Sequence, residues 1–353
     1  MARQRQGTVL INALVVYDVD PLDPASYNDA IGRANAELTY IVPFMRENFI
    51  GFRNAELVST ASKLYVRESR HFVGEYQLTI DDLLENRDQW DKIAIGGYPA
   101  DVQASILQPY GTVIGYPDRY AVPFRSLVPL GVDNLLIVGR SASFTSQAAS
   151  SARVIPLGMA CGQAAGAAAA QSIREDIDFR PLSRDQDAIQ RLQSTLRAQG
   201  AFLEDFYIPE PIMSHWAYDG LATLRRIGLM AGGYENDYQL DGQMNIWSYK
   251  NLLNGVVNKA GLDFSFIDIG SSLTNSSVIE QVTSIVIYSG IISGIDSAYY
   301  SSSSVSSHAG NLEFLSGAGL LDARLADLFA DGDRVPNTAE VVMLLANLYD
   351  FII

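Results

Sequence analysis

The chain has 353 residues, 48% of them hydrophobic and 18% charged, which is enough for two domains and a sizeable core. Its 25 basic and 40 acidic residues give a net charge of −15, which argues against nucleic acid and anionic membranes as partners. The single cysteine, Cys161, excludes an internal disulfide and a cysteine-rich metal site and is expected to be a small buried residue.

The first elements read as a strand region followed by a helix. Gly7 to Tyr17 predicts a strand or a strand pair, and no signal peptide or run of about 18 apolar residues accompanies it. Ala25 to Glu47 has helical spacing of its apolar residues, with a buried stripe expected at Ile31, Leu38, Ile41, Val42 and Met45. Thr79 caps a helix with acids in its first turn, and Ile93 begins a strand that ends in a glycine pair.

The stretch around which the chain is organised lies near its middle. Residues 135–138 are all apolar and predict a fully buried strand that ends at Gly139. A helix of small residues is expected from Gly158 to Ala170, with Gly162 and Gly166 on one face. Such a helix either packs tightly in a core or lies close against a flat ligand, with its N-terminus available to an electron-rich group.

Four phrases occur in the order of a known family: VRESRHFVGEYQLTIDDLL, IAIGGYPADV, YAVPFRSLVPLGVDN and NLLIVGRSAS…SSARVIPLGMACGQAAGAAAA. Together they resemble the C-terminal part of the FAD-dependent oxidoreductase family related to the glutathione-reductase-like flavoproteins, over roughly Gly7 to Ile173. The resemblance implies a partial flavoprotein FAD-binding fold of the α/β (α+β) class.

The resemblance also implies site residues. Arg67, Arg70 and Tyr76 become substrate-side candidates, because a guanidinium group suits a carboxylate or an anionic reduced flavin. His71 is the one local candidate for a histidine base. A salt-bridged strand edge remains the alternative for this segment. The candidate cofactor-binding residues are Gly139, Arg140, Ser141, Arg153, Gly158, Gly162 and Gln163.

One element of an FAD site has no counterpart in the sequence. A dinucleotide site needs a G-x-G-x-x-G turn between a strand and a helix, and the apolar run from Leu10 to Val16 meets no such turn. Arg140 also stands where related flavoproteins carry an acid. We therefore expect a truncated or split flavoprotein, whose ADP-binding half, and with it any signal peptide, belongs to a missing N-terminal part.

The residue pattern of the sequence changes after a helical link. Residues 1–178 would form the oxidoreductase part, 179–204 the link, and 205–353 an all-α tail that resembles S-layer homology (SLH) repeats. Repeat copies are expected from Phe202, from Val282 to Tyr300, and from Leu312 onward, with residues 301–307 as a loop.

The tail resemblance implies a bacterial cell-envelope protein and a cell-wall glycan as partner. The glycan-binding tetrad of that family is approached only by Asn337 to Glu340, without its arginine, and by Tyr249 and Lys250 in the first repeat. The tail could equally pack on the first part or self-associate. Two functions follow: a fragment of an FAD-dependent oxidoreductase with an SLH-like tail, or a non-catalytic interaction module with a degenerate flavoprotein fold.

Overall fold

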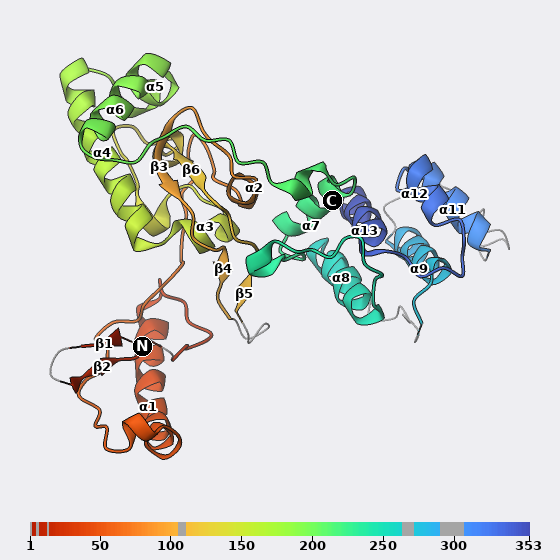
Figure 1. The fold of residues 1–353 in the computed structure, drawn as a ribbon, viewed down its shortest axis with the longest axis horizontal. Coiled ribbons are helices and arrows are strands. Elements are labelled where there is room, and N and C mark those ends of the chain that lie inside the picture. The colour runs from red at the N-terminus through yellow and green to blue at the C-terminus, as the bar shows by residue number, and fades with distance from the viewer. Residues whose placement is uncertain (1, 5–6, 13, 105–110, 263–271, 290–306) are drawn as a thin grey trace.

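The computed structural model describes residues 2–4, 7–12, 14–104, 111–262, 272–289 and 307–353. Figure 1 shows three parts: an arm at the N-terminus, a first body around β3, β6 and α4, and a helical tail. The chain exposes 19480 Å² of surface. A compact monomer of 38.5 kDa would expose about 14,000 Å². The parts are therefore more open than one globule.

The arm is built on one long helix. α1 (Pro24–Asn48) begins where the Asp23 carboxylate accepts hydrogen bonds from two backbone N–H groups, which confirms the helix predicted over 25–47. It is followed by the short η2 (Ile50–Phe52). The expected stripe is only half-buried, and Ala30 alone is buried among the described residues up to 66. The arm supplies too few apolar neighbours to enclose its own helix.

The strand predicted for Gly7 to Tyr17 is mostly absent. β2 (Val9–Leu10) pairs antiparallel with β1 (Ala2–Arg3), and the described residues from 11 to 17 are irregular. Both strands are exposed, because no second layer packs on this hairpin among the residues that the structure places.

Short antiparallel sheets and packed helices make up the first body. β3 (Lys92–Gly96) pairs with β6 (Tyr120–Pro123), and β4 (Asp101–Val102) pairs with β5 (Thr112–Val113). The helices and 3-10 turns of this body are α2 (Ile80–Leu84), η3 (Phe124–Leu127), η4 (Gly139–Ser141), α3 (Ser146–Ala152), α4 (Ile155–Glu175), α5 (Phe179–Arg184) and α6 (Gln186–Ala198). The mixed content agrees with a partial FAD-binding domain.

The strand expected over residues 135–138 is wrong. These residues are irregular, and Leu135 and Val138 are 42% and 37% exposed. A backbone hydrogen bond from Ile137 N to Leu127 O, at 2.9 Å, joins them to the end of η3. A buried strand needs neighbours on both edges and both faces, and the described residues supply only one edge.

The predicted link is packed against the first body. Ile189, Leu192 and Leu196 of α6 form the expected apolar stripe, and they lie in the same core as Leu157 and Cys161 of α4. The chain crosses to the tail further on, through an irregular segment over residues 201–210.

The described part of the tail is helical around one apolar core. Its elements are η5 (Pro211–Ser214), α7 (Tyr218–Arg226), η6 (Gly233–Glu235), α8 (Ile246–Lys259), α9 (Asn275–Tyr288), α11 (His308–Gly317), α12 (Ala323–Leu328) and α13 (Thr338–Ile352). α13 packs against α7 and α8. The predicted second repeat beyond residue 289 and the predicted loop up to residue 306 lie outside the described residues. No helix in the described ranges has the length and apolarity needed to cross a membrane.

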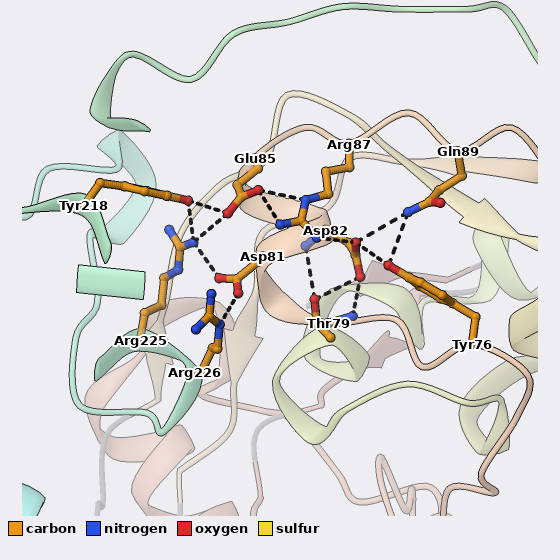
Figure 2. Close-up of polar contacts among 10 residues, drawn as sticks. All are labelled: Tyr76, Thr79, Asp81, Asp82, Glu85, Arg87, Gln89, Tyr218, Arg225 and Arg226. Carbon is orange, nitrogen blue, oxygen red and sulfur yellow. Dashed lines mark hydrogen bonds and ion pairs between the residues drawn. The ribbon is translucent and has the colours of Figure 1, made fainter. Parts of the chain in front are cut away.

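A buried polar cluster joins the first body to the tail (Figure 2). Arg225 of α7, 1% exposed, donates to Asp81 of α2 at 2.7 Å, and Arg226 pairs with the same carboxylate. The Tyr218 hydroxyl donates to Glu85 at 2.6 Å. These contacts hold α2 and α7 side by side.

Candidate functional site

A cleft of about 310 Å³ opens where the arm meets the first body. It lies at the N-terminus of α4, because Val154 is the residue that precedes this helix. Its walls come from the arm, from β4 and the segment before it, and from the turn before α4. They are formed by Asn12, Tyr65, Arg67, Tyr98, Asp101, Arg153 and Val154.

Two guanidinium groups line this cleft. Arg67 Nη1 lies 3.9 Å from Asp101 Oδ2, and its guanidinium carbon lies 5.4 Å from the centre of the Tyr65 ring. Arg153 Nη2 donates to the backbone carbonyl of Asp101 at 3.0 Å. Burial lowers the pKa of Arg153, and the positive charge of Arg67 lowers this pKa further. The structure thus brings together two candidates that are 86 positions apart, Arg67 and Arg153, at one site.

His71 ties the predicted substrate-side segment to the central stretch. Its Nδ1 lies 3.1 Å from the Ala142 carbonyl oxygen, and its Nε2 lies 3.0 Å from Glu68 Oε1. Both partners are acceptors, so the doubly protonated ring satisfies both contacts. The hydrogen bond with Glu68 is the main cause that raises the pKa of His71 above 6.5. With both nitrogens engaged, His71 positions its neighbours and presents no free base.

One face of α4 is open and made of apolar and small residues. Ile155 and Met159 are 68% and 70% exposed, and a methyl group built on Gly162 or Gly166 would meet nothing within 4 Å. The opposite face packs on β3 and α6. Near its N-terminus the helix approaches η4, where a methyl group on Gly158 would lie 3.7 Å from Gly139 Cα. Gly139 has a φ of +75°, a conformation that suits glycine.

Several candidates lie away from the cleft. Arg70 and Arg140 are exposed, and neither makes a hydrogen bond or an ion pair with any residue that the structure describes. Ser141 accepts from Phe72 N through its carbonyl at 3.3 Å, which joins η4 to the segment of His71. Gln163 is exposed and donates to Gln199 at 3.2 Å.

Tyr76 belongs to the polar cluster of α2 (Figure 2). Its hydroxyl donates to Asp82 at 2.6 Å, and the Arg125 guanidinium lies 5.0 Å from the centre of its ring. Burial, followed by the hydrogen bond to Asp82, raises the pKa of Tyr76 to about 12. These contacts describe a neutral phenol that is fixed in the polar cluster of α2. Tyr76 also does not line the cleft.

Residues that sequence reasoning gave no role complete the site. Asn12 and Tyr65 come from irregular backbone of the arm, and Tyr98 and Asp101 follow the glycine pair after β3. A polar or aromatic residue just beyond a strand end is a usable signal for a site. Asn12 and Tyr65 carry no such local signal.

Cys161 is buried in α4, and burial raises the pKa of its thiol to about 12. It therefore packs as a small apolar residue, as predicted. Among the described residues, no group of three or more His, Cys, Asp or Glu side chains is arranged to hold a metal ion.

The residues expected to approach the glycan-binding tetrad, 337–340, lie at the start of α13. Glu340 is buried, and its carboxylate accepts from Arg334 at 2.7 Å and from Asn337 N at 3.0 Å. Tyr249 of α8, which was expected to belong to the first repeat, is fully buried, so its ring belongs to the core. Lys250 lies over the Trp247 ring at 5.4 Å.

A family model described as FAD dependent oxidoreductase matches residues 2–196. This range holds the arm, nearly all of the first body and every residue of the cleft. No curated protein and no solved structure matches the chain.

Proposed function

The chain belongs to the FAD dependent oxidoreductase family, and on that premise we propose that the open face of α4 and the adjoining cleft form the flavin end of an FAD site. The observation that carries this proposal is the uncovered glycine face of α4, which adjoins the arginine-lined cleft. Family membership does not favour the alternative of a non-catalytic interaction module.

The residues present fit the ring end of the cofactor. Gly162 and Gly166 leave room for a flat group along the helix, and Gly158 allows the close approach of η4 at Gly139. Ile155 and Met159 offer apolar contact to its faces. The free N–H groups of the first turn, together with the positive end of the helix dipole, favour negative charge at that place.

When bound, FAD supplies the acceptor for two electrons from the substrate. The chain's own residues bind and orient the flavin and the substrate, and they exclude water from the cleft. Arg67 and Arg153 set a positive potential beside the first turn of α4. His71 fixes the turn that holds Gly139, through its hydrogen bond with the Ala142 carbonyl. In this proposal the substrate and the electron acceptor bind in the cleft.

Filling the glycine face tests the cofactor site. We expect Gly162→Leu and Gly166→Leu to abolish the uptake of FAD, measured as flavin absorbance of the chain purified with and without the product of the adjacent reading frame. Both variants should fold, because their new side chains enter open space and leucine favours a helix. Arg174→Leu, exposed near the far end of α4, is the matched control and should leave uptake unchanged. Equal uptake by the glycine variants and the control would contradict the proposed site.

We further propose that a second polypeptide binds the ADP end of FAD. Two observations support this proposal: the described residues contain no strand–glycine turn–helix unit, and the apolar edge at Leu135 and Val138 is exposed. The arm adds a second uncovered element, α1. Flavin uptake should therefore rise when the chain is co-produced with the product of the adjacent reading frame, and uptake by the chain alone at the same level would refute the need for it.

For the tail we propose an SLH-like unit that anchors the protein to cell-wall glycan. Its support is the pairing of helices around one core and the Arg334–Glu340 ion pair, which restores a guanidinium to the tetrad. Sedimentation of the purified chain with isolated cell walls tests it, and Glu340→Gln should weaken sedimentation. A chain that stays in the supernatant would leave the tail as a packing domain.

A further inference from the structure

We propose that the cleft binds an oxyanion between the guanidinium groups of Arg67 and Arg153. The inference deepens the proposed function and rests on it for the identity of the ligand, which we assign as the carboxylate of a small substrate. A phosphate group of the cofactor shares the same chemistry, and the experiment below separates the two sources.

The lining of the cleft carries a net positive charge. Arg67 and Arg153 contribute two positive charges, and Asp101 is the one carboxylate among the seven lining residues. The Asp101 carboxylate is also held by Gln103, which donates to Oδ2 at 3.0 Å. The lining therefore keeps an excess of one positive charge, although the whole chain carries −15.

The guanidinium groups of Arg67 and Arg153 keep N–H donors that the described residues do not use. A guanidinium has five N–H donors. Arg153 donates one of them to a backbone carbonyl, and Arg67 is 3.9 Å from its nearest carboxylate oxygen. Charge-assisted bonds from such forks to a carboxylate are strong and geometrically specific. The nearby Glu68 carboxylate does not fill this role, because it lies outside the lining and His71 holds it.

The two guanidinium groups that line the cleft also repel one another. Burial is the main cause that lowers the pKa of Arg153, and the positive charge of Arg67 lowers this pKa further. An anion placed between the two groups offsets their repulsion. We therefore expect the two arginines of the cleft to bind an anion more strongly than a single exposed arginine would.

The size of the cleft limits the ligand. Its volume of about 310 Å³ lies at the lower end of small-molecule sites. Tyr65 and Tyr98 give it aromatic walls, and Asn12 adds an amide. A carboxylate on a small organic body fits these walls, whereas a whole dinucleotide exceeds the volume.

The test is calorimetric titration of the full chain at constant ionic strength. Benzoate and acetate probe a carboxylate, and inorganic pyrophosphate and ADP probe a cofactor phosphate. We expect benzoate to bind and to bind more tightly than ADP. Arg67→Met and Arg153→Met should each weaken binding by roughly tenfold or more, because each removes charge-assisted hydrogen bonds.

Two further variants make the result specific. Arg153→Lys keeps the charge but loses the planar fork, so it should bind more weakly than the native chain and more tightly than Arg153→Met. It also keeps the test decisive if Arg153→Met fails to fold, which circular dichroism would show. Arg53→Met removes an exposed arginine of the arm and is expected to bind as the native chain does.

The outcomes separate cleanly. Tighter binding of pyrophosphate or ADP that depends on both arginines would support the oxyanion site and assign it to the cofactor. Absence of anion binding, or native binding by Arg67→Met and Arg153→Met, would overturn the inference. FAD uptake is measured in parallel on the chain co-produced with the product of the adjacent reading frame. Flavin uptake without anion binding refutes only this inference, and anion binding without flavin uptake refutes only the proposed function.

Discussion

At the scale of single residues, the pair of Glu68 and His71 controls how the predicted substrate-side segment meets the turn before α3. Two opposing effects act on the Glu68 carboxylate. Burial raises its pKa, but hydrogen bonds from His71 and Ser146 lower it, and the net pKa falls below 4.5. The pKa of His71 is raised above 6.5. The ion pair is therefore present in the mildly acidic range between these values.

This pair predicts a pH dependence of stability. The imidazolium contributes fully below about pH 6.5 and its contribution is lost as the pH rises through the raised pKa of folded His71. The Glu68 contribution is lost as the pH falls through its lowered pKa. We expect His71→Gln to cost about 0.5–1 kcal/mol more at about pH 6 than at about pH 9, a modest value because the pair is partly exposed.

Urea unfolding of the native chain and of His71→Gln at both pH values measures this difference. Glu68→Gln serves as the control, since it removes the same ion pair from the other side and should flatten the same pH dependence. An equal cost of His71→Gln at the two pH values would show that the neutral ring accounts for the contact.

Not every residue of the site could be predicted. Arg67 and Arg153 came from a resemblance, and the structure places them in one cleft. Their neighbours Asn12 and Tyr65 lie on irregular backbone, whose path depends on contacts made elsewhere in the chain. No local pattern encodes such a position, so sequence reasoning missed them.

At the scale of elements, helices with local signals were predicted well. The Thr79–Asp82 capping box starts α2, and the small-residue run after Pro156 forms α4. The strand over 135–138 failed because its burial depends on neighbours that sequence alone does not supply. The same holds for the α2–α7 junction: Asp81 and Arg225 are 144 positions apart, so their hydrogen bond could not be inferred from spacing.

That junction predicts an asymmetric pair of mutations. Arg225→Met should lower the free energy of unfolding by about 3 kcal/mol, because it leaves the buried Asp81 and Glu85 carboxylates without their buried cation. Arg226→Met should cost less than about 1 kcal/mol, because Arg226 is 53% exposed although it pairs with the same Asp81. Denaturant melts measure both values, and similar costs for the two arginines would contradict a buried role for Arg225.

At the scale of the whole molecule, the arm, the first body and the tail are joined unequally. The first body and the tail share buried ion pairs, whereas the arm has one buried side chain among its described residues. The division into a flavoprotein-like part and a helical part was predicted from two family resemblances, and its bounds stay a prediction. The projection of the arm was not, because an amphipathic stripe states which face is apolar and leaves open what covers it.

This arrangement predicts an extended particle in solution. A compact chain of 353 residues has a radius of gyration of about 20 Å. We expect small-angle X-ray scattering of the monomer to give a clearly larger value, because the arm stands apart from the first body (Figure 1). A measured radius near 20 Å would mean that the arm folds back in solution.

The glycines of α4 carry a further consequence. Each glycine inside a helix weakens it by about 1 kcal/mol relative to alanine. No described residue approaches Gly162 or Gly166 closely enough to require the missing methyl group. Alanine at both positions would therefore stabilise α4 in the unliganded chain. The native glycines leave this helix less stable than its packing requires. Selection for a rigid helix would favour alanine at these two positions, whereas selection for a bound ligand favours glycine. The native sequence has glycine at both.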